Sequence, residues 1–521
     1  MPTIIAASIV VGMYLGLYIS PNRTAPSKVA RTAETKTSYL LKLIEHNYVD
    51  SVSINDIQEK IIPEILAELD PHSVYIPYED MSDANEALDG KFDGIGVVFN
   101  MMTDTVVVLN VISGGPSFKA GIVAGDRIIK VDDKNIAGQS MPQDSVVKLL
   151  RGPRDTEVNL LIERSGVSSN MTIPVIRGVI PIKSLDAAFM IAPQVGFVKL
   201  SRFSRTSYKE LIEALASFKQ QGMTRLIFDL RGNSGGFLDQ AIMIANEFLA
   251  ANKLIVYTED KNKRQTRQYS DGQGQFSDVE LMMLIDEGSA SSSEILSGAM
   301  QDNDRAMIIG RRSFGKGLVQ EQVPFSDGSA VRLTVARYYT PTGRSIQKPY
   351  DNGSDKYEEE VLDRYMHDEF FNADSIKFDS TLRFTTPEGR IVYGGGGIMP
   401  DKFVPADSTR YSRNMQNILR ENLIYRFALK FCDAHREQLN KIQTLSELDD
   451  FYKANDIYAE FVNYVRANSK GVNASSLSSD RKLLLPQLKA IVGRNTPLED
   501  NAFYYYIAEI DDVLKVALQQ E

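Results

Sequence analysis

Residues 281–317 read LMMLIDEGSASSSEILSGAMQDNDRAMIIGRRSFGKG. The segment opens with LMMLID, a short apolar run that is typical of a buried strand, and RAMIIG is a second run of this kind. Between them, small residues lead into EILSGAMQD, whose apolar spacing predicts a helix that starts at about Ser292. A strand, a helix and a second strand in this order indicate a layered α/β core.

The same alternation extends over residues 175–405. GFVKL precedes a helix from Tyr208, RLIFDL precedes a helix from Leu238, and LIVYT precedes the quoted segment. The sequence therefore predicts a multidomain α/β protein with this region as its core. Residues 33–68 carry helical periodicity as well, and the chain beyond residue 405 is again helical in pattern.

Length and composition limit the classes of protein. With 521 residues the chain is too long for one core and should form about three or four domains. Its 58 Lys and Arg against 68 Asp and Glu give a net charge of −10, which provides no basic surface for nucleic acid. The single cysteine, Cys432, excludes an internal disulfide, and four scattered histidines argue against zinc. We expect neither a metal nor a cofactor.

The N-terminal stretch carries no charge before Arg23, and residues 3–20 read TIIAASIVVGMYLGLYIS. This length is near the lower limit for a membrane-spanning helix and exceeds most signal-peptide cores. We therefore expect an uncleaved anchor or a signal segment at residues 1–21, with a buried core helix as the third alternative. Because Arg23, Lys28 and Arg31 follow the span, the positive-inside rule by itself would place the body of the protein in the cytosol.

From about Phe92 the pattern changes to short β runs, which predict a β-rich module. Gly94, Ile95, Gly96 and Val97 open the first run, and such glycines let backbone amides turn toward a carboxylate. Together with the following SGGPSFKAGIVAGDRI, this loop resembles a PDZ domain, a module that binds an extended C-terminal peptide by strand addition. A β-barrel whose glycines only serve turns is the alternative.

Ser291 stands at the predicted turn from strand to helix. Small residues there allow a substrate to come close, and the N-terminus of a helix stabilises developing negative charge. The same residues also fit a plain helix cap, in which Ser291 and Glu294 form a capping box.

Lys316 lies in the second motif, GRRSFGKGLVQ at 310–320, which nearly matches a phosphate-binding P-loop. A P-loop needs Ser or Thr where this chain has Gly317, and LVQEQVPF reads as a strand rather than the required helix. A lysine buried between glycines can instead lose its proton and serve as a base for a serine hydroxyl. Since neither motif contains histidine, Ser291 and Lys316 fit a Ser–Lys pair better than a Ser–His–Asp triad.

The β module, GSASSSEI, AMQD, SFGKGLVQ and YYTPTGRSIQ occur in an order that closely resembles the C-terminal processing proteases, also called tail-specific proteases, of peptidase family S41. The resemblance implies a crotonase/ClpP-like layered α/β protease core with an inserted PDZ domain, an N-terminal helical segment and a C-terminal helical domain. It places the nucleophile on Ser291, the general base on Lys316 and the glutamine that orients this lysine on Gln320. Asp302 matches an acidic position that supports the site in some members.

DLRGNSGG at residues 229–236 also matches the family. We expect one amide of the oxyanion hole from Gly235 or Gly236 and another from Ser292, although a structural turn would explain the glycines as well. Ser292 stands where alanine is common in the family, a small departure at a position that contributes mainly its backbone amide. His72, in the matching segment LDPHS, is expected to be structural.

The expected function is that of a serine endopeptidase that binds apolar protein C-termini through its PDZ domain and cleaves nearby through an acyl-enzyme. Movement of the PDZ domain to gate the site is a hypothesis from the resemblance. We expect the protein on the periplasmic side of the cell envelope, held at the inner membrane by residues 3–20. A non-catalytic PDZ scaffold is the alternative function.

The segment 406–521 would either pack on the core or mediate oligomers. The expected domains are the anchor or signal segment, the N-terminal helical region, the PDZ domain, the protease core and the C-terminal helical domain, at residues 1–21, 22–82, 83–170, 171–405 and 406–521.

Overall fold

The computed structural model describes residues 35–101, 104–112, 114–351, 353–407 and 409–520. The chain divides into two compact units, Met1–Glu68 and Leu69–Glu521. The predicted anchor or signal at residues 3–20 lies outside the described residues. Within the described ranges, no helix combines the length and the apolar character that crossing a membrane requires.

In its described part, the first unit consists of two helices, α2 (Lys36–Asn47) and α3 (Ile54–Ala67), as the periodicity predicts. Each begins at a hydroxyl residue. The Thr35 side chain accepts a hydrogen bond from the N–H of Ser38, and the Ser53 side chain accepts one from the N–H of Asp56. Both residues therefore satisfy backbone donors that a helix leaves free in its first turn.

A six-stranded sheet forms the centre of the second unit. Its order is β10–β11–β12–β15–β16–β21, and each neighbouring pair is parallel except β10–β11. Both faces of the sheet are covered, which is why its strands read as continuous apolar runs. The strands are β10 (Leu185–Ala192), β11 (Val195–Leu200), β12 (Arg225–Asp229), β15 (Glu280–Ile285), β16 (Ala306–Gly310) and β21 (Lys402–Phe403).

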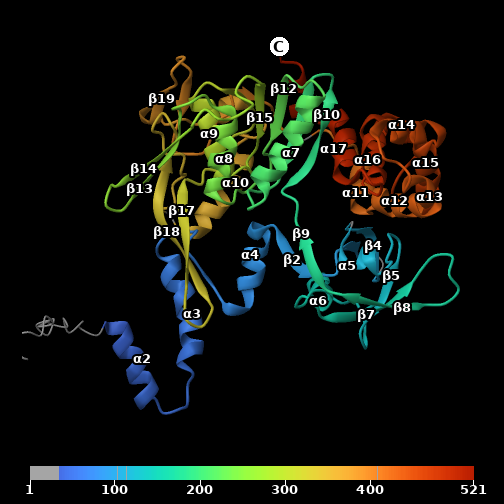
Figure 1. Ribbon diagram of the computed structural model, residues 1–521, viewed down its shortest axis with the longest axis horizontal. Coiled ribbons are helices and arrows are strands. Elements are labelled where there is room, and N and C mark those ends of the chain that lie inside the picture. The colour runs from blue at the N-terminus through green and yellow to red at the C-terminus, as the bar shows by residue number, and fades with distance from the viewer. Residues whose placement is uncertain (1–34, 102–103, 113, 352, 408, 521) are drawn as a thin grey trace, which may run out of the picture. The chain divides into compact units, whose positions relative to one another are not determined.

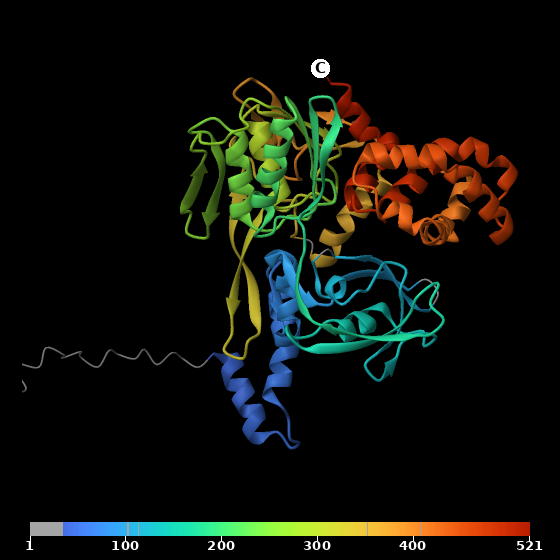
Figure 2. The ribbon, with the colours of Figure 1, turned by 45° about the vertical axis from the view of Figure 1, so that its right-hand side comes forward.

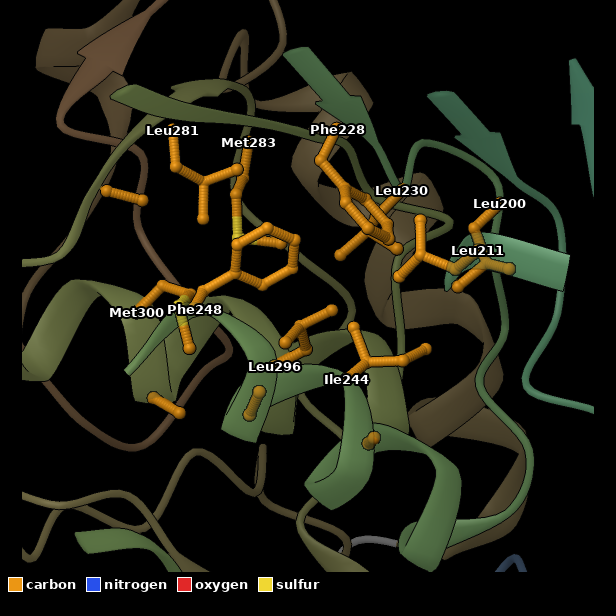
Figure 3. Close-up of a cluster of buried hydrophobic side chains, with 14 of the residues drawn as sticks. Leu200, Leu211, Phe228, Leu230, Ile244, Phe248, Leu281, Met283, Leu296 and Met300 are labelled. Atoms are coloured by element: carbon orange, nitrogen blue, oxygen red, sulfur yellow. The ribbon is translucent and has the colours of Figure 1, made fainter. Parts of the chain in front are cut away.

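Three helices cover one face of this sheet, namely α7 (Ser207–Gln220), α8 (Leu238–Phe248) and α9 (Ser292–Asp302). They lie close together in the green part of the ribbon (Figure 1). Their apolar side chains pack on alternate residues of the strands, among them Phe228 and Met283. Figure 3 shows Leu296 and Met300 of α9 within this layer, close to Phe248 of α8. The helix that follows Ser291 is thus anchored in the main core.

The opposite face is covered by the end of the chain, helices α17 (Glu499–Ile507) and α18 (Asp512–Leu518). Val513, Leu514 and Ala517 of α18 pack against the remaining alternate residues of the same strands, which are Phe197, Ile227, Met282, Leu284 and Ile309. The last part of the C-terminal helical segment therefore belongs to the core.

The rest of the C-terminal segment has an apolar core of its own. It consists of α11 (Arg413–Arg420), α12 (Leu423–Ala434), α13 (Arg436–Leu439), α14 (Leu445–Ala454), α15 (Ile457–Asn468) and α16 (Arg481–Gly493). Buried aromatic residues such as Phe427 and Phe461 pack edge to face in this cluster. The predicted C-terminal helical domain is therefore confirmed.

A second sheet flanks the core, in the order β1–β18–β13–β14, with β17 paired to β18. Its strands are β1 (Val74–Ile76), β13 (Leu254–Asp260), β14 (Gln265–Tyr269), β17 (Leu318–Pro324) and β18 (Ala330–Tyr339). The β17–β18 hairpin, yellow in Figure 2, runs out from the layered core. Because β17 begins two residues after Lys316, a strand follows the FGKG motif as predicted, where a P-loop would require a helix.

The β module is inserted between two short antiparallel strands, β2 (Lys91–Gly94) and β9 (Gly178–Pro181). Its sheet has the order β3–β4–β5–β7–β8, with β6 beside β5. These elements are β3 (Val97–Asn100), β4 (Val106–Val111), α5 (Pro116–Lys119), β5 (Arg127–Val131), β6 (Lys134–Asn135), α6 (Gln143–Leu150), β7 (Glu157–Glu163) and β8 (Met171–Ile176). Helix α4 (Met81–Asp89) precedes the module.

After β18 the chain forms a further helix, α10 (Ser354–Met366). A small hairpin of β19 (Arg383–Thr385) and β20 (Ile391–Tyr393) follows it. Tyr357 and Arg364 are the buried residues of α10, although the helix is otherwise polar. Their contacts belong to the candidate site.

Leu296→Ala tests how firmly α9 is held. Leu296 has no exposed surface, so its truncation leaves a cavity and should lower the free energy of unfolding by about 2–5 kcal/mol. Val323→Ala, at a side chain 49% exposed on β17, is the matched control and should change it by less than about 1 kcal/mol. Thermal and urea unfolding measure both. Equal stability of the two variants would show that α9 is not anchored as described.

Candidate active site

Ser291 lies directly before α9, at the turn that follows β15. Its backbone has φ 53° and ψ −113°, a region that residues with a side chain rarely adopt. Strained backbone of this kind persists only where its surroundings hold it, and it is common at functional sites. The conformation also places the Ser291 side chain at the positive end of the α9 dipole.

The DLRGNSGG turn packs directly on Ser291. A Cβ atom on Gly235 would lie 2.8 Å from the Cβ of Ser291, and the φ of Gly235 is +103°. Only glycine fits this position for both reasons. Asn233 fixes the turn, because its side-chain Nδ2 donates to the carbonyl of Leu200 and its carbonyl accepts from the Ser293 hydroxyl.

The backbone N–H groups near Ser291 differ in whether they already have a hydrogen-bond acceptor. The N–H of Gly235 donates to Oδ1 of Asn233 at 2.9 Å, so it is used within the turn. The N–H groups of Gly236 and Ser292 have no hydrogen-bond acceptor among the described residues. Of the three predicted donors, these two are the ones available for an oxyanion. The Ser292 hydroxyl donates to the carbonyl of Gly236 at 2.8 Å, so the serine that replaces alanine here fastens the turn.

Lys316 lies in the loop between β16 and β17. Burial, followed by the positive charge of Arg332, lowers the pKa of Lys316, while the carboxylates of Glu294 and Asp70 oppose this shift. No hydrogen bond or ion pair joins its ammonium to another residue in the part of the chain that the structure describes. A partly buried lysine without a counter-ion loses its proton more readily, as a general base must.

The Glu294 carboxylate joins the two predicted catalytic residues. Its Oε2 accepts the N–H of Ser291 at 2.9 Å and the N–H of Lys316 at 2.8 Å. Its Oε1 accepts the Ser313 hydroxyl at 2.5 Å and the N–H of Gly315 at 2.7 Å. The bond to Ser291 is half of the predicted capping box, but the other three bonds reach a different loop. One fully buried carboxylate thus holds the serine turn and the lysine loop together.

Burial raises the pKa of Glu294 to about 7, although its four hydrogen bonds act in the opposite direction. A proton on Glu294 would compete with the donors that already point at both oxygens. The arrangement of the two loops is therefore tied to the ionised form.

Tyr338, in the YYTPTGRSIQ segment, is a second link between the same residues. Its hydroxyl lies 2.5 Å from the carbonyl of Lys316 and 3.1 Å from that of Ser291. Burial raises the pKa of Tyr338 well above its usual value, so it remains a donor. This role could not be predicted from the sequence, because an aromatic strand residue more often belongs to the apolar core.

Neither Gln320 nor Asp302 forms a hydrogen bond with Lys316 within the described residues. The Nε2 of Gln320 donates to Oγ1 of Thr334 at 3.2 Å, and the described structure contains no hydrogen bond between Gln320 and Lys316. Asp302 stands at the far end of α9, where it accepts from Arg344 at 2.7 Å and from the Thr342 hydroxyl at 2.7 Å. Asp302 thus supports the site at a distance, by fixing the TPTGR loop to the helix.

The LDPHS segment lies beside the lysine. Asp70 accepts from the Ser73 hydroxyl at 2.6 Å and from Thr334 at 3.0 Å, which connects it to the partner of Gln320. Burial, followed by the positive charge of Lys316, lowers the pKa of His72 to about 4, so this histidine is neutral near pH 7. Its Nε2 lies 2.8 Å from the hydroxyl of Tyr357.

Helix α10 supports the lysine loop from outside. The Arg364 guanidinium donates to the carbonyls of Ser313 and Phe314, at 2.7 and 3.0 Å. It also pairs with Glu360, which binds the buried ammonium of Lys348 at 3.1 Å. The charged residues of α10 thus fix the carbonyls that precede Gly315 and Lys316.

The β module presents the predicted carboxylate-binding loop. Gly94 ends β2, Ile95 is buried in the apolar core of the module, and Gly96 has φ +76°. The N–H groups of Ile95 and Gly96 have no backbone acceptor among the described residues. Val97 begins β3, which pairs only with β4 and so leaves one edge open within the described sheet. An open strand edge next to free amides fits the addition of a peptide strand.

No group of His, Cys, Asp and Glu side chains within the described ranges could hold a metal ion. The FGKG loop also differs from a phosphate cradle, because its amides at Gly315 and Lys316 already bind Glu294. The loop that carries Lys316 is therefore not arranged to bind a nucleotide phosphate.

Comparison with known proteins assigns three parts of the chain to families. Residues 194–352 match the model of peptidase family S41, residues 94–175 match the PDZ domain, and residues 414–496 match a family of unknown function. The chain is 33% identical to the carboxy-terminal-processing protease of Bartonella bacilliformis, over 64% of this chain and 78% of that protein. It is 32% identical to a probable CtpA-like serine protease of Staphylococcus aureus, over 66% and 68%. A solved photosystem II D1 C-terminal processing protease shares 28% identity, with a TM-score of 0.34, over 59% of this chain and 89% of that one.

Glu294→Gln tests the link between the two loops. An amide cannot accept from four donors, so hydrogen exchange at the amides of Ser291, Gly315 and Lys316 should become faster. The free energy of unfolding should fall by about 1–3 kcal/mol. The matched control is Glu287→Gln, which breaks a partly exposed pair with Arg311 and should leave these amides protected. Unchanged exchange in the Glu294 variant would contradict the link.

Proposed function

Because the chain belongs to peptidase family S41, among relatives of the carboxy-terminal-processing proteases, we propose that it is a serine endopeptidase in which Ser291 is the nucleophile and Lys316 the general base. One observation carries the proposal. A single oxygen of Glu294 binds the backbone N–H groups of both residues. Two motifs 25 positions apart in the sequence are therefore held at one point in space.

In the first step, the hydroxyl oxygen of Ser291 attacks the carbonyl carbon of the substrate peptide, and its proton passes to the neutral amine of Lys316. The tetrahedral intermediate then collapses. Lys316 returns the proton to the leaving amine, and an acyl-enzyme on Ser291 remains. Water, deprotonated by Lys316, attacks this ester in the same way and releases the new C-terminus. No histidine takes part, in line with the neutral, hydrogen-bonded state of His72.

The negative charge of the intermediate would be held by the N–H groups of Gly236 and Ser292 together with the N-terminus of α9. Such donors stabilise the transition state because they are oriented before the reaction begins. The hydroxyl of Ser292 contributes indirectly, since it holds Gly236 in place.

The PDZ domain would select substrates by their C-termini. The free amides of Ile95 and Gly96 would hold the terminal carboxylate, and the open edge of β3 would pair with the residues before it. Val97 and Phe99 of β3 are apolar and only partly buried, which favours an apolar C-terminal residue beside this strand.

Cleavage of an unfolded protein with an apolar C-terminus tests both parts of the proposal. We expect the wild type to cleave it, and Ser291→Ala and Lys316→Ala each to reduce kcat at least about 10³-fold. Amidation of the substrate C-terminus should raise KM with little change in kcat, because it removes only the carboxylate that the PDZ domain binds. Product formation is followed by gel electrophoresis and mass spectrometry.

The control is Glu321→Gln, at an exposed carboxyl of β17 outside the proposed site, which should cleave at the wild-type rate. Binding of the free C-terminus without any cleavage by the wild type would favour the alternative of a non-catalytic scaffold. Cleavage that survives Ser291→Ala would exclude Ser291 as the nucleophile.

The pH dependence of kcat should reflect two groups, each of which raises kcat when it loses its proton. Lys316 must be neutral, so kcat rises with pH through its lowered pKa, and Glu294 must be ionised, so kcat falls below about pH 7. The free energy of unfolding should fall, rather than rise, as the pH increases. A carboxyl whose pKa is raised on folding stabilises the protein most at acid pH, and this contribution is lost as the pH rises through about 7.

Rates and melting temperatures between about pH 5 and 9 measure both effects. Glu321→Gln, at an exposed carboxyl of β17, is the matched control and should reproduce the wild-type profile. A value of kcat that stays constant or falls as the pH rises from about 5 to 8 would contradict the assignment.

A further inference from the structure

Arg231, in the turn that carries Gly235 and Gly236, binds two carboxylates from distant parts of the chain. Its guanidinium donates to Asp229 through Nε at 3.0 Å and through Nη2 at 2.6 Å. It also donates to Asp511 through Nη1 at 3.0 Å and through Nη2 at 2.6 Å. Both contacts are bidentate, the geometry in which an arginine fixes a partner's orientation as well as its distance.

Asp511 reaches this place from the end of the chain. It caps α18, accepting the N–H of Leu514 at 3.1 Å, while the apolar side of α18 packs on the face of the core sheet away from α9. This segment lies outside residues 194–352, which match the peptidase family, and outside residues 414–496. A part of the chain with no catalytic motif therefore contacts the turn of the proposed oxyanion hole.

The hydrogen-bonded cluster around Arg231 contains two positively and two negatively charged side chains, and Asp511 supplies one of the negative charges. Lys199 and Arg231 face Asp229 and Asp511, and Lys199 donates to Asp229 at 3.3 Å and to the carbonyl of Arg231. The Asp229 side chain is 1% exposed and that of Asp511 16%, so water screens these charges poorly. Without Asp511, Asp229 would be the carboxylate that is hydrogen-bonded to both Lys199 and Arg231, with Asp286 as the next, partly buried carboxylate beside the turn.

The position of Arg231 affects the amides that follow it. The next residue, Gly232, donates to Asp286 at 2.7 Å, and Asn233 then holds the N–H of Gly235. The far end of the turn is fixed as well, since Phe203 donates to the carbonyl of Gly235 at 2.9 Å and accepts from the N–H of Phe237 at 2.8 Å. Arg231 thus fixes one end of the turn and Phe203 the other, so a shift of Arg231 would strain the segment that orients the Gly236 N–H. Donors of an oxyanion hole are sensitive to such changes, since they act by being oriented in advance.

We propose that Asp511 is a positioning residue for catalysis, which holds Arg231, and through it the Gly236 amide, in the direction that the oxyanion requires. This inference rests on the proposed function. It assigns the C-terminal helices a part in the reaction and makes the transition state, rather than substrate binding, depend on them.

Asp511→Asn is the decisive variant, because asparagine still caps α18 but carries no charge. Asp512→Asn is the matched control, since Asp512 is the next residue and pairs with Lys515 near the surface. The substrate is a peptide with an apolar C-terminus, and the probe is a peptidyl boronic acid, which places an oxygen in the oxyanion hole after Ser291 adds to boron. Peptide binding without cleavage is measured in the Ser291→Ala background.

We expect Asp511→Asn to lower kcat about tenfold and to weaken boronate binding by a similar factor, part of the 10²- to 10³-fold that losing a whole donor costs. KM and peptide binding should stay at the wild-type values, and Asp511→Glu should recover part of kcat. Wild-type kcat and boronate affinity in Asp511→Asn would overturn the inference. So would a loss of peptide binding as large as the loss of kcat, because that indicates general disruption.

Hydrogen exchange tests the role of Asp511 even if the wild-type protein is inactive. If the wild type neither cleaves the peptide nor binds the boronate, the proposed function fails, and hydrogen exchange at residues 231–236 decides the structural part. Faster exchange in Asp511→Asn than in Asp512→Asn would support the role of Asp511 in holding the turn. Equal exchange in the two variants would overturn it.

Discussion

The hydrogen-bonded carboxylate of Glu294 is the constraint on which the site depends. It has no exposed surface, and its four donors come from the serine turn and from the lysine loop. A buried carboxylate that loses donors carries an uncompensated charge, so the two segments stay together as long as Glu294 is ionised. Tyr338 joins the same segments through their carbonyls. The two proposed catalytic residues are thus held through their backbones, and the Lys316 amine has no hydrogen bond or ion pair within the described residues.

The topology of the sheet explains why these contacts can form. Strands β12, β15 and β16 are neighbours and run parallel. The DLRGNSGG turn, the serine turn and the lysine loop follow their respective carboxyl ends, so all three meet at one edge of the sheet. Binding sites in open α/β sheets commonly lie at this edge, because successive loops converge there. Apolar packing of α9 then fixes the direction of the helix N-terminus that faces the site (Figure 3).

Two segments beyond the matched peptidase region reach these loops. Helix α10 contributes Arg364 to the carbonyls before Lys316, and the C-terminal helices contribute Asp511 to the DLRGNSGG turn. Both contacts use partly or fully buried charges. Such charges are costly unless each has a partner with good geometry, and here Glu360 and Asp229 complete the pairing. Helix α10 and the C-terminal helices therefore stabilise particular loop positions rather than simply enlarging the core.

The sequence by itself determined the order of the elements and the two catalytic candidates, because strand and helix periodicity, turn glycines and the serine and lysine motifs are all local signals. It also identified Glu294, but only as a helix cap, since its bonds to Ser313, Gly315 and Lys316 join residues that are distant in sequence. Tertiary structure alone decided which glycine amide is free, that Gln320 binds Thr334, and that Asp302 binds Arg344. It alone brought Asp511 to Arg231. These pairings depend on which side chains meet after the sheet closes between its two layers of helices, and no spacing along the chain encodes that.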